Sequence, residues 1–143
     1  MSHTLETVQG LYQAFGRGDV PAILAQLSPD VRWESWAAHS AQQAGHPLYA
    51  ARVGPQQASE FFAVLGQNME IHEFKVLDVF GSGRQVAGEC LIDYTWRPTG
   101  KRLQDEELHL WTFGDDGKVV RFRHYVDTAK HMRAAGLLAD QKG

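Results

Sequence analysis

The sequence has little cysteine and no long apolar run. Cys90 is the single cysteine among 143 residues, which excludes an internal disulfide and a thiolate cluster for structural zinc. No stretch approaches the roughly 20 apolar residues that a helix needs to cross a bilayer. The first residues, Met1–Glu6, lack a basic segment followed by an apolar one, so we expect no secretory signal and no membrane partner, and a cytoplasmic location by default.

The chain also has no excess of charge of one sign. It carries 14 Lys and Arg against 17 Asp and Glu, with a formal net charge of -3, and the basic residues are dispersed. A nucleic-acid partner is therefore not expected, because phosphate-backbone binding requires a basic patch or stripe. The hydrophobic fraction of 43% is typical of globular proteins, and residues 1–143 are expected to form a single domain.

Two helices are predicted at the N-terminus. From Leu5 to Phe15, apolar residues recur at three- and four-residue steps, which predicts a helix ending near Gly16 or Gly18. Asp19 can cap a second, short helix over residues 20–27, with a proline tolerated in its first turn. Ser28-Pro29-Asp30 is then expected to end that helix.

The segment from Val31 to Gly54 has a weaker pattern. Val31–Trp36 alternates as a strand, with Trp33 on one side and Glu34 on the other. Residues 37–54 show no sustained periodicity and predict a long loop that could form a pocket lid. Two histidines in that loop are expected to be solvated, because their spacing matches no familiar metal site; these are His39 and His46.

A third helix and four long strands complete the predicted fold. Pro55 suits the first turn of a helix with one apolar face, formed by Ala58, Phe61, Phe62 and Leu65. Strands follow over residues 70–80, 85–97, 102–113 and 119–127. Glycine- and proline-containing turns between them predict an antiparallel meander. Asp127 or Thr128 can cap a last short helix with Ala129 and Met132 directed inward, and the element order predicts an α+β domain with helices on one face of the sheet.

One face of the predicted sheet mixes aromatic residues with groups that hold charge or share protons. We assign this face by strand alternation, with Cys90 and Arg123 each opposite His109 on its two neighbouring strands. Apolar walls with a few polar groups are typical of a site for a small organic ligand. The residues of this pocket face are Tyr94, Trp96, Glu107, His109, Trp111, Arg121, Arg123, Tyr125 and Asp127.

The opposite face of the sheet is more uniformly apolar. Its residues are Leu91, Leu108, Leu110, Val120, Phe122 and Val126. A contiguous apolar patch is costly to leave in water, so we expect this outer face to pair with a second copy of the chain as a homodimer.

Five short segments, taken in order, carry a family resemblance. They are Val8–Asp19 (VQGLYQAFGRGD), Asp30–Trp33 (DVRW), His109–Phe113 (HLWTF), Asp116–Val119 (DGKV) and Tyr125–Asp127 (YVD). In this order and spacing the chain resembles the NTF2-like superfamily, and especially its SnoaL-like members. The resemblance implies a cystatin-like cone, in which a curved antiparallel sheet wraps around N-terminal helices and encloses an internal pocket.

The resemblance also implies positions for catalytic groups. In ketosteroid isomerases, a tyrosine on the first helix corresponds to Tyr12, a general base on the first strand to Ser35, and a second acid on a later strand to His109. In SnoaL-like polyketide cyclases and enzymes similar to limonene epoxide hydrolase, a carboxylate three residues before the aspartate of the last helix corresponds to His124. An imidazole there can still transfer protons. Strict alternation places His124 on the outer face, so only a bulge or bend could bring it into the pocket.

These observations favour a cofactor-independent enzyme that performs acid–base chemistry on a partly apolar organic molecule, as an isomerase, cyclase or hydrolase. The expected catalytic residues are His109, His124 and Tyr12, and no metal is expected. The expected substrate-binding residues are Trp33, Trp96, Glu107, Trp111, Arg123, Tyr125 and Asp127. The alternative is a noncatalytic ligand-binding or dimeric assembly domain, in which His109 is a core histidine bonded to Glu107 or Tyr125 and Asp127 only caps a helix.

Overall fold

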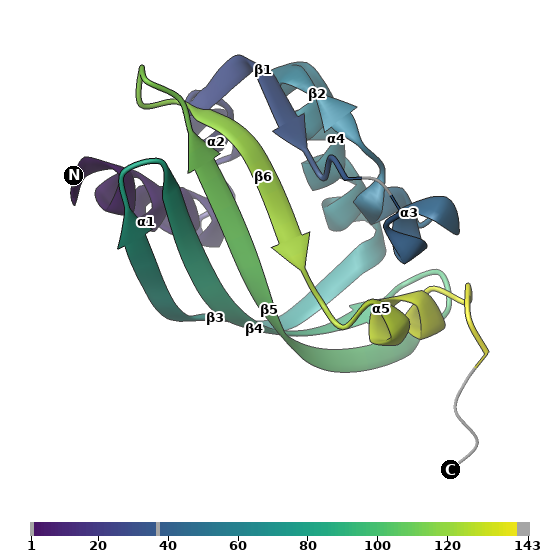
Figure 1. The fold of residues 1–143 in the computed structure, drawn as a ribbon. Helices are drawn as coiled ribbons and strands as arrows, with labels where there is room; N and C mark the ends of the chain where they lie inside the picture. The colour runs from purple at the N-terminus through teal and green to yellow at the C-terminus, as the bar shows by residue number, and fades with distance from the viewer. Residues whose placement is uncertain (1, 37, 140–143) are drawn as a thin grey trace.

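The protein is an α+β fold in which helices cover one side of a curved, open sheet (Figure 1). A computed structural model describes residues 2–36 and 38–139; Met1, Ala37 of the predicted loop and residues 140–143 lie outside the described part. Helices α1 (Ser2–Gly16), α2 (Val20–Leu24) and α4 (Gly54–Asn68) pack on the inner side of the sheet. Helix α5 (Thr128–Ala134) lies at the opposite end of the sheet from α1.

The sheet has six strands in the order β2-β1-β6-β5-β4-β3. Their bounds are Leu27–Trp33 (β1), Arg52–Val53 (β2), Met69–Ser82 (β3), Gln85–Trp96 (β4), Lys101–Phe113 (β5) and Val119–Tyr125 (β6). Strands β3 to β6 form the predicted antiparallel meander, whereas β1 pairs in parallel with β6. The α+β prediction is confirmed.

The pairing of β4 with β5 preserves the predicted faces although the predicted register is wrong. Cys90 lies opposite Glu107, and Gly88 rather than Cys90 lies opposite His109. Because this shift is two residues, each side chain stays on its predicted side of the sheet. Glu107, His109 and Trp111 are all buried on the inner face, as predicted. Cys90 is a buried free thiol, also as predicted.

The pairing of β5 with β6 departs from the prediction by a single residue. This shift moves every later residue of β6 to the opposite face of the sheet from the one predicted. Phe113 pairs with Val119, but Thr112 pairs with Arg121, so β6 contains one extra residue at this step. Such a bulge reverses the alternation. His124 therefore lies opposite His109 and is buried, while Arg123 lies opposite Leu110 on the outer side. The predicted inward orientation of Arg123 is wrong.

The same bulge corrects three further placements. Phe122, predicted on the outer face, is buried and stacks on Trp33 with ring centroids 4.2 Å apart. Tyr125 is exposed and stacks on Trp36 instead of lining the inner face. Arg121, expected inside, alternates with Phe122 and His124 on the outer side of β6.

Residues 38–54 form a packed wall rather than a solvated loop. They contain α3 (Ser40–Gln43), a 3-10 turn η1 (Pro47–Tyr49) and β2. His39 and His46 are both buried, and each accepts a hydrogen bond at Nδ1 from the first turn that follows it. Burial lowers the pKa of His46 to about 4. Both histidines therefore act here as neutral helix caps, and their predicted solvent exposure is wrong.

The helices begin where their caps predict. Asp19 accepts a hydrogen bond from the amide of Ala22, and Asp127 accepts one from the amide of Lys130. Helix α2 ends at Leu24, earlier than predicted, because β1 begins at Leu27 and includes Ser28-Pro29-Asp30. In α5 the fully inward residues are His131 and Ala134.

No helix within residues 2–36 and 38–139 is long and apolar enough to cross a membrane. The outer face of the sheet keeps partly exposed apolar residues, namely Leu91, Leu108, Leu110 and Val120. Val126, which we predicted on this face, packs against the core instead. With Phe122 removed from it, this outer face is smaller than predicted and is bordered by Arg121 and Arg123.

The homodimer remains a prediction, which the oligomeric state of the protein in solution can test. If two copies pair through the outer face, replacing Leu108 and Leu110 together by lysine should place charges in the apolar contact and convert a dimer to a monomer. Sedimentation velocity at micromolar concentration reports this change, with Leu77→Lys on the edge strand β3 as the control. A monomeric wild-type protein would contradict the prediction.

Gly88 is expected to be essential for packing, because the Tyr12 ring of α1 lies directly against its backbone. A Cβ at Gly88 would overlap the Tyr12 hydroxyl and lie 2.7 Å from Cζ of the ring. Overpacking of this kind costs about 1–3 kcal/mol, so Gly88→Ala should lower the unfolding free energy by that amount in urea denaturation. The control is Gly10→Ala in α1, where nothing lies within 4 Å. That change should stabilise the protein by about 0.5–1 kcal/mol.

Candidate functional site

A cavity with aromatic walls lies between the inner face of the sheet and helices α1 and α4. About 480 Å³ of space free of protein atoms lies among its lining residues, and this figure includes open solvent at its mouth. Most of its lining is apolar, and its polar groups come from α1, β5 and β6. The lining residues are Leu11, Tyr12, Phe15, Ile23, Trp33, Phe61, Phe62, Phe74, Glu107, His109, Trp111, Phe122 and His124.

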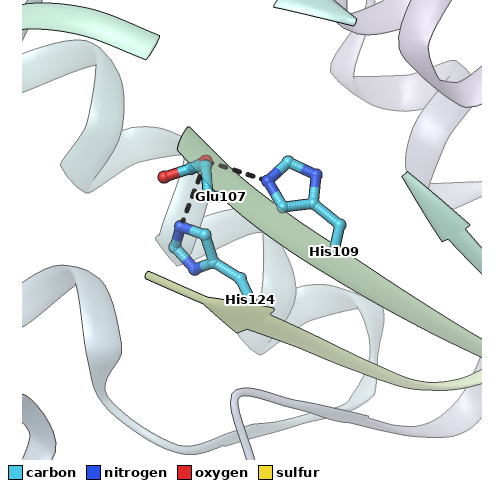
Figure 2. A group of neighbouring side chains, drawn as sticks. All are labelled: Glu107, His109 and His124. Carbon is cyan, nitrogen blue, oxygen red and sulfur yellow. Dashed lines mark hydrogen bonds and ion pairs between the residues drawn. The ribbon is translucent and has the colours of Figure 1, made fainter. Parts of the chain in front are cut away.

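Hydrogen bonds and one longer ion pair link the polar groups of the cavity, and Glu34 beyond it, into one chain. Tyr12 Oη lies 2.8 Å from His109 Nδ1, and His109 Nε2 lies 2.9 Å from Glu107 Oε1. His124 Nε2 lies 3.8 Å from the same Glu107 oxygen, and its Nδ1 lies 2.7 Å from Glu34 Oε1. Figure 2 shows the two imidazoles on neighbouring strands, both directed at the Glu107 carboxylate. The chain thus alternates acids and imidazoles: Tyr12, His109, Glu107, His124 and Glu34.

The central pair is ionised across the neutral pH range. Burial alone would raise the pKa of Glu107, but the charge of His124 and the hydrogen bond and charge of His109 outweigh it and lower the pKa to about 2. Burial alone would lower the pKa of His109, but hydrogen bonds to Cys90 and Glu107 outweigh it and raise the pKa to about 10. His109 is therefore an imidazolium that donates from both ring nitrogens.

His124 and Glu34 form the second buried pair. Burial acts to lower the pKa of His124, and the charges of Glu34 and Glu107 outweigh it, so this pKa is raised. Glu34 is fully buried just beyond the end of β1, with a φ of 58°. This left-handed backbone is uncommon for a residue other than glycine. It interrupts the alternation of β1 and turns inward a side chain that we predicted to point outward.

Three neighbouring residues hold the Tyr12 side chain in place. Its hydroxyl accepts hydrogen bonds from Trp111 Nε1, at 3.1 Å, and from the protonated Nδ1 of His109. Its ring rests on Gly88 and stacks on the His109 imidazole with centroids 5.7 Å apart. Burial raises the pKa of Tyr12, so the phenol is neutral. With two donors already bound to Oη, the phenol's own hydrogen can be donated to the Cys90 sulfur, with which Tyr12 also interacts, or to a ligand in the cavity.

A further buried histidine, His131, lies outside the cavity. His131 of α5 bonds Tyr94 Oη through Nδ1, at 2.7 Å, and Asp105 Oδ2 through Nε2, at 2.8 Å. Asp105 Oδ2 also accepts from the amide of Asp127. This group fixes α5 to the sheet. It repeats the tyrosine–histidine–carboxylate order of Tyr12, His109 and Glu107, but none of its side chains lines the aromatic cavity.

The structure brings together six of the ten predicted site residues around the cavity. They are Tyr12, Trp33, Glu107, His109, Trp111 and His124. The prediction that His124 reaches the cavity only through a bulge is confirmed. Among the family positions, Ser35 does not reach the cavity: its Oγ bonds the guanidinium of Arg32, and the inward carboxylate is that of its neighbour Glu34.

Four predicted substrate-binding residues lie elsewhere. Arg123 donates to the carbonyl of Ser35 and lies over the Trp36 ring, and Tyr125 stacks on that ring. Asp127 is exposed and caps α5. Trp96 is buried against His46 and does not line the aromatic cavity. The prediction placed Arg123 and Tyr125 on the wrong face because it did not foresee the bulge in β6. No local sequence motif marks the position of that bulge.

Two groups of side chains have the spacing of metal ligands. One donor atom from each of Glu107, His109 and His124 lies within 4.8 Å of the others, and the same holds for Asp105, Glu107 and His131. Both groups are buried. All three residues of the first group line the cavity, whereas Glu107 is the one member of the second group that does.

Solved structures of similar fold cover nearly the whole chain. An NTF2-like protein of unknown function from Burkholderia pseudomallei is 28% identical, with a TM-score of 0.75 over 94% of this chain and 98% of that one. An NTF2-like protein from Burkholderia thailandensis is 26% identical, with a TM-score of 0.79 over 94% and 98%. TerC, co-crystallised with polyporic acid, is 24% identical, with a TM-score of 0.73 over 94% and 99%.

The sequence itself gives the family. No curated protein with a matching sequence was found. Residues 8–122 match the model of the SnoaL-like domain, a span that runs from α1 to β6 and contains every cavity-lining residue except His124. The fold, with its curved sheet around N-terminal helices, is that of the NTF2-like structures. The chain therefore belongs to the SnoaL-like domain family.

Proposed function

We propose that the protein is an enzyme that activates an oxygen atom of a small, partly apolar organic molecule by proton donation, as an isomerase, cyclase or hydrolase. The observation that supports this most is the chain from Tyr12 through His109 to Glu107. It directs a neutral phenol, backed by an imidazolium, into an aromatic cavity. Preorganised donors in a dry site are the arrangement that stabilises negative charge developing on a substrate oxygen.

The order of these groups along the chain supports one sequence of proton movements. The Tyr12 hydroxyl donates to a carbonyl, hydroxyl or epoxide oxygen of the substrate. As charge develops on that oxygen, the Tyr12 proton moves to it, and the proton on His109 Nδ1 moves to Tyr12 Oη. His109 then becomes neutral. It keeps its Nε2 proton, which stays hydrogen-bonded to Glu107. Glu107 remains a carboxylate throughout and stabilises the imidazolium in the resting state.

The cavity also indicates the class of substrate. Most of its walls are aromatic rings, which include Trp33, Phe61, Phe74 and Phe122. Such walls favour flat or cyclic apolar skeletons, while the few polar groups fix the orientation of an oxygenated end. Polyporic acid, with which the similar-fold protein TerC was co-crystallised, is therefore a rational first probe, together with terpenoid, steroid-like and aromatic polyketide-like compounds.

Loss of the proton donor should abolish turnover while binding persists. For any compound that raises the melting temperature and is converted, His109→Gln and Tyr12→Phe should each lower kcat by roughly 100-fold or more with little change in KM. Product analysis by mass spectrometry measures this. The matched controls are His131→Gln and Tyr94→Phe, which remove the same hydrogen-bonded pair outside the cavity. Full activity of His109→Gln would contradict the assignment, and binding without conversion would favour a noncatalytic ligand-binding domain.

The buried ion pair should also make stability depend on pH. The folded-state pKa of His109 is about 10 against an ordinary 6.5, so its contribution is complete below pH 6.5 and is lost as the pH rises toward 10. Wild type should lose up to about 1.4 kcal/mol of unfolding free energy per pH unit across that window relative to His109→Gln. Urea denaturation followed by tryptophan fluorescence measures the difference, and parallel pH profiles for the two proteins would contradict the pairing.

A further inference from the structure

The two imidazoles at the deep end of the cavity point the same ring atom at one carboxylate oxygen. His109 Nε2 and His124 Nε2 lie 2.9 and 3.8 Å from Glu107 Oε1 (Figure 2). A divalent metal ion bound at about 2.0–2.2 Å in tetrahedral geometry separates its ligand atoms by about 3.3 Å. The two observed distances lie on either side of this value. All three donor atoms lie within 4.8 Å of one another, so side-chain rotations that bring the two imidazoles to this spacing would place them around one ion.

We propose that Glu107, His109 and His124 bind a divalent first-row transition metal ion such as Zn²⁺, with its remaining coordination positions open toward the aromatic cavity. Two histidines and one carboxylate form a common ligand set for zinc and for non-haem iron sites that keep open positions. This inference goes beyond the proposed function and does not require the cavity to be catalytic.

The outer ring nitrogens of both histidines have the partners that metal-bound histidines need. His124 Nδ1 lies 2.7 Å from Glu34 Oε1, and His109 Nδ1 lies 2.8 Å from Tyr12 Oη. A ligating histidine usually donates its second N–H to an acceptor of this kind, which leaves the Nε2 lone pair for the metal. Glu34 is fully buried, and its Oε2 has no hydrogen-bond partner within residues 2–36 and 38–139. A second buried carboxylate therefore lies next to the proposed ligand set.

The charges of the cluster also suit a divalent cation. Glu34 and Glu107 contribute two formal negative charges in the interior, where unbalanced charge is costly. One divalent ion with two neutral imidazoles balances them as completely as two imidazolium protons do. Metal and protons therefore compete for the same two Nε2 atoms, and a metal-loaded protein cannot use His109 as an acid.

The neighbouring group of Asp105, Glu107 and His131 is a weaker candidate. Asp105 Oδ2 already accepts hydrogen bonds from the His131 ring and from the amide of Asp127. The bond of His131 Nδ1 to Tyr94 matches that of His109 Nδ1 to Tyr12 and does not distinguish the two groups. The donors to Asp105 stabilise the position of α5, so His131→Gln provides a matched control: it removes an equally buried histidine–carboxylate pair outside the proposed ligand set.

Metal titration of the full-length, chelator-treated protein tests the proposal. Calorimetry with Zn²⁺ alone should show a single ion per chain with a dissociation constant in the micromolar range or below. Glu34→Gln should weaken binding by roughly 10–100-fold, and His124→Gln should weaken it further. His131→Gln should bind Zn²⁺ like the wild type. Co²⁺ bound to wild type should give visible absorption without a thiolate charge-transfer band.

Several results would overturn the proposal. They are no Zn²⁺ binding at millimolar concentration, wild-type affinity in His124→Gln, or loss of binding in His131→Gln with retention in His124→Gln. A thiolate band with Co²⁺ would place Cys90 among the ligands and overturn the three-residue set even if His124→Gln fails to fold. If turnover is measured on chelator-treated protein and metal binding without any substrate, the proposed function and the metal site can fail separately.

Discussion

The site depends on one buried carboxylate, that of Glu107. Water is nearly excluded from it, and burial opposes its charge; His124 and His109 supply the opposing charge that keeps it ionised. The dependence is mutual, because both histidines are buried and hold their protons through carboxylates. Removing one member of such a group leaves the others as uncompensated buried charges. The cluster is therefore retained or lost as a unit, and it fixes the polarity of the deep end of the cavity.

The inner position of His124 is set by backbone pairing rather than by composition. Alternation in β4 and β5 is regular, so the sequence is sufficient to assign Glu107, His109 and Trp111 to the inner face even with an incorrect register. In β6 a single extra residue exchanges the two faces. Because a bulge there depends on how β5 and β6 pair, and not on a local motif, alternation assigned Arg123 inward and His124 outward. The family resemblance identified His124 where periodicity did not.

Glu34 and the segment around Tyr49 show a second limit of sequence patterns. Glu34 turns inward through a positive φ, a conformation that glycine would signal and glutamate does not. His39, His46 and Tyr49 lie in a segment without periodicity, yet their rings pack together, and Tyr49 stacks on His124 with centroids 5.1 Å apart. The segment predicted as a loop is ordered by contacts with residues far away in the sequence, such as that of Tyr49 with His124. The helices and the strand meander, which rest on local signals, were largely predictable.

The arrangement of apolar and polar surface constrains how a ligand enters. A second hollow, near the turn between α1 and α2, shares Phe15, Ile23, Phe62 and Phe74 with the aromatic cavity and contains no ionisable lining residue. The ionised groups lie at the opposite end, where β5 and β6 pair. A ligand that enters through these rings must lead with its oxygenated end if that end is to reach Tyr12, and its apolar skeleton then remains among the aromatic side chains. This polarity favours molecules with oxygen at one end over those with polar groups all round, because the latter would leave polar atoms unsatisfied against the rings.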